Sequence, residues 1–126
     1  MTSERIVATE EQQKKLEVRV SELLHNLGIP AHIKGYRYVR RAIIIVTENP
    51  NISITKELYP SVAKEFDTTA SRVERAIRHA VELSSERCDI DTINEIFGNS
   101  VSYKKSKPTN SEFIAMLADK LYLEGK

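Results

Sequence analysis

The stretch "TTASRVERAIRHAVEL", residues 68–83, determines how the rest of the chain is interpreted. It predicts a helix over about residues 70–86, because Thr69 is a good N-cap and Ser71 is an alternative one. Successive residues of an α-helix advance by about 100°. On such a wheel the basic side chains fall within one arc, which holds Arg72, Arg75, Arg78 and His79. The opposite arc is mainly apolar and holds Val73, Ala76, Ile77, Ala80 and Ser84.

The residues before this helix predict a shorter helix and a tight turn. Ser53 can cap a short helix that runs to about Leu58, and Pro60 suits the first position of a helix over about residues 60–66. "DTT", residues 67–69, is the predicted turn. A short helix, a turn and a longer helix form the outline of a helix-turn-helix, whose second helix can lie in the major groove of DNA.

The side chains near the start of the predicted helix suit the chemistry of that groove. Guanine presents acceptors that arginine can bind, and cytosine presents an amino group that a carboxylate can accept. The predicted base-contacting residues are therefore Arg72, Glu74 and Arg75, and Arg78 and His79 are suited to backbone phosphates. An ordinary solvated helix face is the alternative, because three arginines and one glutamate give residues 72–79 a local charge of only +2.

Two further basic clusters bear on this choice. The formal net charge of the whole chain is only +1, so a nucleic-acid-binding surface must come from local clusters. "KGYRYVRR", residues 34–41, has four basic residues and no acid, and "YKKSKP", residues 103–108, has three lysines. Each cluster could be ordinary surface, but on one face with the 70–86 helix they would form a phosphate-binding rim. The predicted phosphate contacts accordingly also include Thr69, Ser71, Lys34, Lys104 and Lys105.

The remaining segments predict further helices. "TEEQ", residues 9–12, is a capping box for a helix over about residues 10–27, which Gly28 and Pro30 end. "KGYRYVRRAIIIVTENP", residues 34–50, combines helical spacing with strand-like "AIIIV", and a helix is favoured because no partner strand is apparent. A short helix opens at Asp89 or Asp91 and ends at Gly98, and "TNSE", residues 109–112, is a second capping box before an amphipathic final helix.

These elements predict an all-α fold, a compact bundle of about six helices that contains the helix-turn-helix. The scarcity of helix breakers, four glycines and four prolines, supports the same fold class. We expect one domain over residues 10–126, preceded by a linker or an added end at residues 1–9. The single cysteine, Cys88, excludes an internal disulfide. The longest apolar run, residues 42–46, is too short to cross a bilayer, so we expect a soluble, cytoplasmic protein.

Enzymatic functions are disfavoured by the residues present. His25, His32 and His79 are not at metal-ligand spacing, and no glycine-rich loop could hold a nucleotide. Cys88 and the serines at 84 and 85 lack a catalytic signature. We therefore predict no catalytic residues, no cofactor and no metal.

Three stretches resemble one protein family: "IPAHIKGY" at 29–36, "TASRVERAIRHA" at 69–80 and "KPTNSEFIAMLADKL" at 107–121. The chain resembles, over about residues 20–123, the C-terminal effector domain of the stage zero sporulation protein A family of response regulators. The resemblance implies an all-helical domain that binds a DNA box similar to TGTCGAA, often as tandem dimers, and that activates or represses promoters. It places the base-reading positions on Arg72, Glu74 and Arg75 and the backbone contacts on Arg78 and His79.

The sequence also departs from the family pattern. The phosphorylated receiver domain of these two-component regulators is not found in these residues, so the chain resembles an effector fragment or a shortened relative. "VELSSERCDID", residues 81–91, lacks the tryptophan and glycine expected where the family contacts the RNA polymerase sigma subunit. A homodimer would be expected to pair through the final helix, around Phe113–Leu121, unless those residues are core. The competing hypothesis is a helical protein-interaction module that has lost specific DNA binding.

Overall fold

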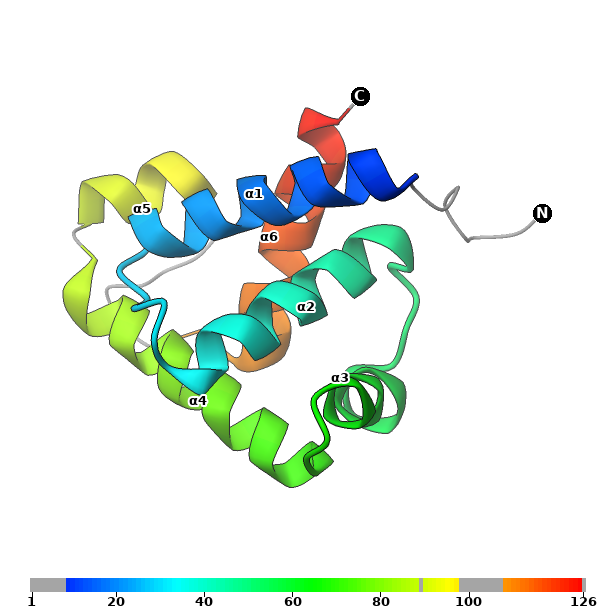
Figure 1. The fold of residues 1–126 in the computed structure, drawn as a ribbon. Coiled ribbons are helices and arrows are strands. Elements are labelled where there is room, and N and C mark those ends of the chain that lie inside the picture. Colours follow the sequence, from blue (N-terminus) through cyan, green and yellow to red (C-terminus); the bar gives the residue numbers. More distant parts are fainter. Residues whose placement is uncertain (1–8, 89, 98–107, 126) are drawn as a thin grey trace.

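The computed structural model describes residues 9–88, 90–97 and 108–125, and the regular secondary structure within these ranges is helix, with no strand. Figure 1 shows the arrangement of the helices. In chain order the elements are α1 (Glu10–Asn26), α2 (Lys34–Glu48), a π-helical turn η1 (Ile54–Leu58), α3 (Tyr59–Glu65), α4 (Ala70–Arg87), α5 (Ile90–Phe97) and α6 (Asn110–Glu124). The predicted all-α fold class is therefore confirmed.

Both predicted capping boxes are present, whereas Asp89 lies outside the described residues. At the start of α1 the Thr9 side chain accepts from the backbone N–H of Gln12, whose own side chain accepts from the Thr9 backbone N–H. The same reciprocal pair joins Thr109 and Glu112 at the start of α6. These bonds satisfy N–H groups that a helix terminus would otherwise leave unpaired, and so they fix where the two helices begin.

A sharp turn over residues 66–69 joins α3 to α4, as predicted from "DTT". Asp67 adopts a φ of 54°, in the left-handed region, which aspartate tolerates better than most side chains. The Thr68 N–H donates to the carbonyl of Ala63 at 2.9 Å, which closes the end of α3. The Thr69 side chain then accepts from the Arg72 N–H at 3.2 Å, so Thr69 rather than Ser71 is the N-cap of α4.

Helix α2 lies in the middle of the bundle and contacts α1, α4 and α6 (Figure 1). Its side chains at Val39, Ala42 and Ile43 are fully buried. Burial on several sides explains the continuous apolar run that also looked like strand material, because an all-round apolar helix segment belongs in a core. The predicted helix over this segment is confirmed.

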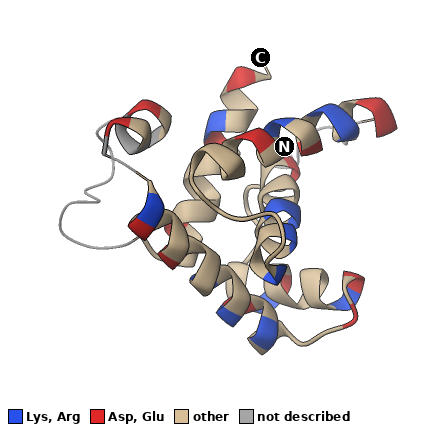
Figure 2. Cartoon of the chain, turned by 60° about the vertical axis from the view of Figure 1, so that its left-hand side comes forward, with Lys and Arg blue, Asp and Glu red and all other residues tan. Residues whose placement is uncertain are grey.

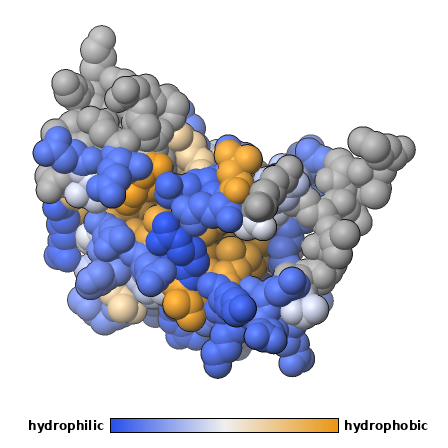
Figure 3. Space-filling view, turned by 90° about the horizontal axis from the view of Figure 1, so that it is seen from above, coloured by the Kyte–Doolittle hydropathy of each residue, from blue (hydrophilic) through white to orange (hydrophobic). Residues whose placement is uncertain are grey.

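Helix α6 contributes much of the rest of the core. Its buried apolar side chains are Phe113, Ile114, Leu117, Ala118 and Leu121. They are therefore not free to form a dimer surface, and of the two readings of this segment the structure supports the core. Among the described residues, two large hydrophobic side chains stay exposed, Val18 on α1 and Leu123 near the end of α6. Figure 3 shows that some hydrophobic side chains are visible among hydrophilic ones on the face seen from above.

Candidate nucleic-acid interface

Helix α4 presents one buried and one basic face, as the helical wheel predicts. Val73, Ile77 and Ala80 are fully buried, and Ser84 is buried with them. The opposite side is exposed at Arg72, Arg75, Arg78 and His79. Figure 2 shows basic segments on α4 and on α2. The exposed arc of α4 has two edges with different neighbours, which we name the Lys34 side and the Asn110 side.

The Lys34 side is the edge of α4 that faces the start of α2. A shallow groove here is lined by Lys34, Tyr38, Thr68, Arg72, Arg75, Ala76 and His79. The structure thus brings Lys34, predicted from a distant part of the sequence, next to three basic residues of α4. Within the described residues, no ion pair involves Lys34, Arg72 or Arg75. This edge therefore carries positive charge that no described carboxylate neutralises.

Gly35 makes this close approach possible. A Cβ atom at Gly35 would lie 2.2 Å from the carbonyl oxygen of Ala76 and 3.0 Å from the Cβ of Ala80. Only a residue without a side chain allows the two backbones to lie so near each other. The glycine therefore determines how near the neighbouring Lys34 lies to α4.

The other basic residues of the 34–41 cluster do not join this groove. Arg37 lies over the ring of Phe66, 5.0 Å from its centroid, and Arg41 forms an ion pair with Glu65 at 2.7 Å. Arg40 turns toward α1 and donates to the Ser21 hydroxyl. Of the described basic residues in this cluster, Lys34 alone lines the groove beside α4, where the predicted phosphate-binding rim would lie. Lys104 and Lys105 lie outside the described residues.

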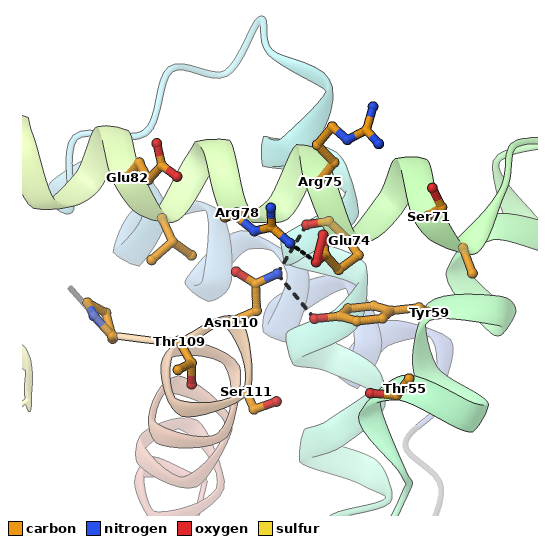
Figure 4. Close-up of a pocket in the computed structure, with 13 residues that line it drawn as sticks. Thr55, Tyr59, Ser71, Glu74, Arg75, Arg78, Glu82, Thr109, Asn110 and Ser111 are labelled. Atoms are coloured by element: carbon orange, nitrogen blue, oxygen red, sulfur yellow. Dashed lines mark hydrogen bonds and ion pairs between the residues drawn. The ribbon is translucent and has the colours of Figure 1, made fainter.

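The Asn110 side is a larger groove between α4, η1 with the start of α3, and the start of α6 (Figure 4). Its lining includes Thr55, Tyr59, Ser71, Glu74, Arg75, Arg78, Glu82, Asn110 and Ser111. Predicted phosphate contact Ser71 is exposed on this side. Thr69 is also exposed, but its oxygen is already an acceptor in the helix cap.

Polar contacts organise this second groove. Glu74 and Arg78, one turn apart on α4, form an ion pair. The Asn110 side-chain amide donates to the Tyr59 hydroxyl and to the main-chain carbonyl of Glu74, both at 3.1 Å. Figure 4 shows these contacts, with Arg75 extending away from Asn110. Two of the predicted DNA contacts are therefore paired with each other, and Asn110 ties α6 to the backbone beneath them.

The surroundings of Tyr59 favour the neutral form of its hydroxyl. Burial raises the pKa of its hydroxyl, because a phenolate would lose solvation there, and the hydrogen bond from Asn110 opposes this only in part. The hydroxyl consequently accepts from Asn110 while keeping its own hydrogen.

Sequence reasoning missed Gly35, Tyr59 and Asn110. A glycine inside a helical pattern is itself a signal, since it costs helix stability unless close packing requires it. The other two residues gave no comparable signal, because Asn110 falls inside a capping box and Tyr59 inside an apolar pattern. Their role depends on α3 and α6 meeting beside α4, which only the tertiary structure shows.

The described residues show neither a membrane-crossing helix nor a metal centre. In residues 9–88, 90–97 and 108–125, no helix has the length and apolar character needed to cross a membrane. The same ranges contain no cluster of three or more histidine, cysteine, aspartate or glutamate side chains that could hold a metal ion.

A helical bundle that exposes the basic arc of one helix beside a short preceding helix defines a class of small domains that can present a helix to nucleic acid. A comparison with protein families narrows the class. The family model described as "Sporulation initiation factor Spo0A C terminal" matches residues 20–121, and the chain belongs to this family. It is thus a DNA-binding regulatory domain of sporulation, from a family that is not one of enzymes. The resemblance inferred from the three sequence stretches is confirmed.

Proposed function

We propose that the chain binds double-stranded DNA with sequence specificity and regulates transcription of sporulation genes. In this proposal α3, the turn at 66–69 and α4 form a helix-turn-helix, and α4 lies in the major groove. The observation that carries it is the exposed basic arc on the first half of α4, opposite a fully buried apolar face. Membership of the DNA-binding family supports the same conclusion.

The recognised site is a box similar to TGTCGAA. Arg72 and Arg75 lie in the first turns of α4 and are exposed, so both can reach guanine acceptors. Glu74, between them, would accept from a cytosine amino group. Backbone phosphates would be contacted by Arg78, His79, Thr69, Ser71 and Lys34, and in the segment outside the described residues by Lys104 and Lys105.

A domain over residues 10–126 would pair with a second copy on tandem boxes. Because the buried face of α6 is core, the surface for pairing would be its other side, where Met116 and Leu123 line a shallow groove with Ile96. A contact with the RNA polymerase sigma subunit would fall around residues 81–91. Titration of single-box and double-box duplexes tests the pairing, since independent occupancy of the two boxes would contradict it.

The central test measures, by fluorescence anisotropy, how tightly the chain binds a TGTCGAA duplex and a scrambled duplex. Each duplex is titrated at two salt concentrations. We expect the wild-type chain to prefer the box at both. Arg72→Ala or Arg75→Ala should weaken box binding by about 1–3 kcal/mol and reduce the preference. Lys14→Ala, which removes an exposed charge from α1, is the matched control and should leave the preference unchanged.

The possible failures are distinct. Equal losses on both duplexes would mean that Arg72 and Arg75 contact phosphates only, because phosphate contacts carry no sequence information. No preference of the wild-type chain for the box would instead favour a protein-interaction module.

A further inference from the structure

The ion pair between Glu74 and Arg78 has a consequence for how the chain distinguishes DNA sequences. Within the described residues, it is the one ion pair that involves a side chain of α4. Arg78 would otherwise offer a positive charge to any phosphate, whatever the sequence. With the carboxylate of Glu74 on it, that charge is neutralised in the free protein.

The pair is exposed enough to open. The side chain of Arg78 is 58% exposed and that of Glu74 32% exposed. Exposed pairs one helical turn apart are weak, so the pair can open where both groups gain new partners. The main chain below is fixed, since Asn110 holds the Glu74 carbonyl at 3.1 Å. Opening is therefore a change of side-chain conformation on a helix whose backbone does not need to move.

Each member of the pair has a different alternative partner on DNA. A carboxylate at Glu74 can accept from a base, which only some sequences supply, whereas Arg78 can bind a phosphate, which all sequences supply. Arg75 points away from the pair in Figure 4, so it does not compete for Glu74. The release of Arg78 is thus coupled to whether Glu74 finds its base.

We propose that the Glu74–Arg78 pair is a specificity gate, and this rests on the function proposed above. On non-cognate DNA, opening would leave the Glu74 carboxylate without a partner in a groove lined by phosphates, so the pair stays closed and Arg78 adds no phosphate contact. On the cognate box Glu74 turns to a cytosine amino group, and Arg78 is released to bind a phosphate. The pair then increases discrimination between cognate and non-cognate DNA in two ways. Glu74 adds a base contact, and Arg78 adds a phosphate contact that forms only when the base contact forms.

The salt dependence of binding tests the gate, because each phosphate contact contributes roughly 0.9 to the magnitude of the negative slope of log K against log salt, called the slope below. We would measure this slope on the TGTCGAA duplex and on the scrambled duplex for the wild-type chain, Arg78→Gln, Glu74→Gln and the double variant. Arg78→Gln should lower the slope by roughly 0.9 on the box only. Glu74→Gln should raise it by a similar amount on the scrambled duplex and bind that duplex several-fold more tightly. The double variant should return to the wild-type slope there.

Glu82→Gln is the matched control. Glu82 lies on the same helix and lines the same groove, but no described ion pair involves it. Its replacement removes the same charge without releasing an arginine, so the slope on the scrambled duplex should not rise. Circular dichroism and thermal unfolding of every variant check that the fold is retained, which is expected because glutamine is a good helix former.

The outcomes separate the gate from the proposed function. If Arg78→Gln lowers the slope equally on both duplexes, or if Glu74→Gln leaves the scrambled slope unchanged, the gate is overturned while specific binding stands. If the wild-type chain shows no preference for the box, the proposed function fails and the gate fails with it.

Discussion

Both edges of α4 carry basic residues, but the edges differ in whether a carboxylate pairs with those residues. On the Lys34 side, Lys34, Arg72 and Arg75 have no carboxylate partner among the described residues. On the Asn110 side, Arg78 is paired with Glu74, and Asn110 holds the backbone under the pair. The formal charge of a helix therefore does not tell how much of that charge a ligand meets. The neighbours of each side chain, on α4 itself and on the helices packed against it, decide it.

The two edges are also built differently. The Lys34 side depends on shape, because Gly35 lets α2 approach the backbone of α4. The Asn110 side depends on hydrogen bonds, which join α6 and Tyr59 to α4. Substitutions that disturb packing should affect the first edge, and substitutions that remove a donor or an acceptor should affect the second.

The largest effect is expected from Gly35→Ala. The new methyl group would lie 2.2 Å from the Ala76 carbonyl oxygen, so α2 and α4 must move apart. Such overpacking in a core costs about 1–3 kcal/mol of unfolding free energy. Urea denaturation measures it, with Gly125→Ala as the control, because there the added atom meets only ordinary contacts at 3.6 Å. Equal stability of the two variants would show that the close approach is not required.

Asn110→Ala should remove the hydrogen bonds of the Asn110 side and lower the unfolding free energy by a somewhat smaller amount. It removes two hydrogen bonds from a half-buried site and leaves the Tyr59 hydroxyl without its donor. At about 0.5–1.5 kcal/mol for each bond, we expect a loss of about 1–2 kcal/mol of unfolding free energy. Ser111→Ala changes the next, exposed residue and is the control. A loss in Ser111→Ala as large as that in Asn110→Ala would contradict a stabilising role for the two hydrogen bonds of Asn110, which we call the hydrogen-bonded clasp.

Much of the fold could be predicted from local sequence, and the reasons are physical. Thr9, Thr69 and Thr109 cap helices through contacts within four residues, so the signal lies entirely in the nearby sequence. The buried face of α4 follows from helical periodicity in the same way. Final-helix residues such as Phe113 were ambiguous, because an apolar stripe has the same spacing whether it faces a core or a second copy.

The site could be predicted less completely. Periodicity placed Arg72, Arg75 and Arg78 on one face without distinguishing them, although the i, i+4 spacing of Glu74 and Arg78 favours an ion pair between these two. Residues 34–41 looked like one basic cluster, yet Arg40 turns to α1 and only Lys34 reaches the groove. The turn of Arg40 toward α1 depends on residues far apart in sequence, which composition and spacing do not record.

Lys34→Ala tests whether the Lys34 side of α4 contacts backbone phosphates. The side chain is exposed and belongs to no described ion pair, so its removal should not destabilise the fold. Binding should weaken about equally on box and scrambled duplexes, and the salt slope should fall by about 1 on both. Lys14→Ala on α1 should leave the slope unchanged. A fall confined to the box would mean that Lys34, like Arg78, contributes only in the specific complex.

The smallest effect is the pH dependence expected from Tyr59 on the Asn110 side. Burial raises the pKa of its hydroxyl above the ordinary value of 10.0, so the folded state favours the neutral form. The stability from this preference is fully present below pH 10 and is lost as the pH rises through the folded pKa, because the unfolded chain ionises first.

Tyr59→Phe lacks this titration but also lacks the acceptor for Asn110, which should cost about 0.5–1.5 kcal/mol at pH 8. Unfolding free energies from pH 8 to 11 should therefore show a difference between the two proteins that shrinks at the alkaline end. The other tyrosines titrate in both proteins and cancel in the difference. A difference that stays constant would mean that the hydroxyl is solvated in the folded state, and the hydrogen-bonded clasp of this edge would then be open to water.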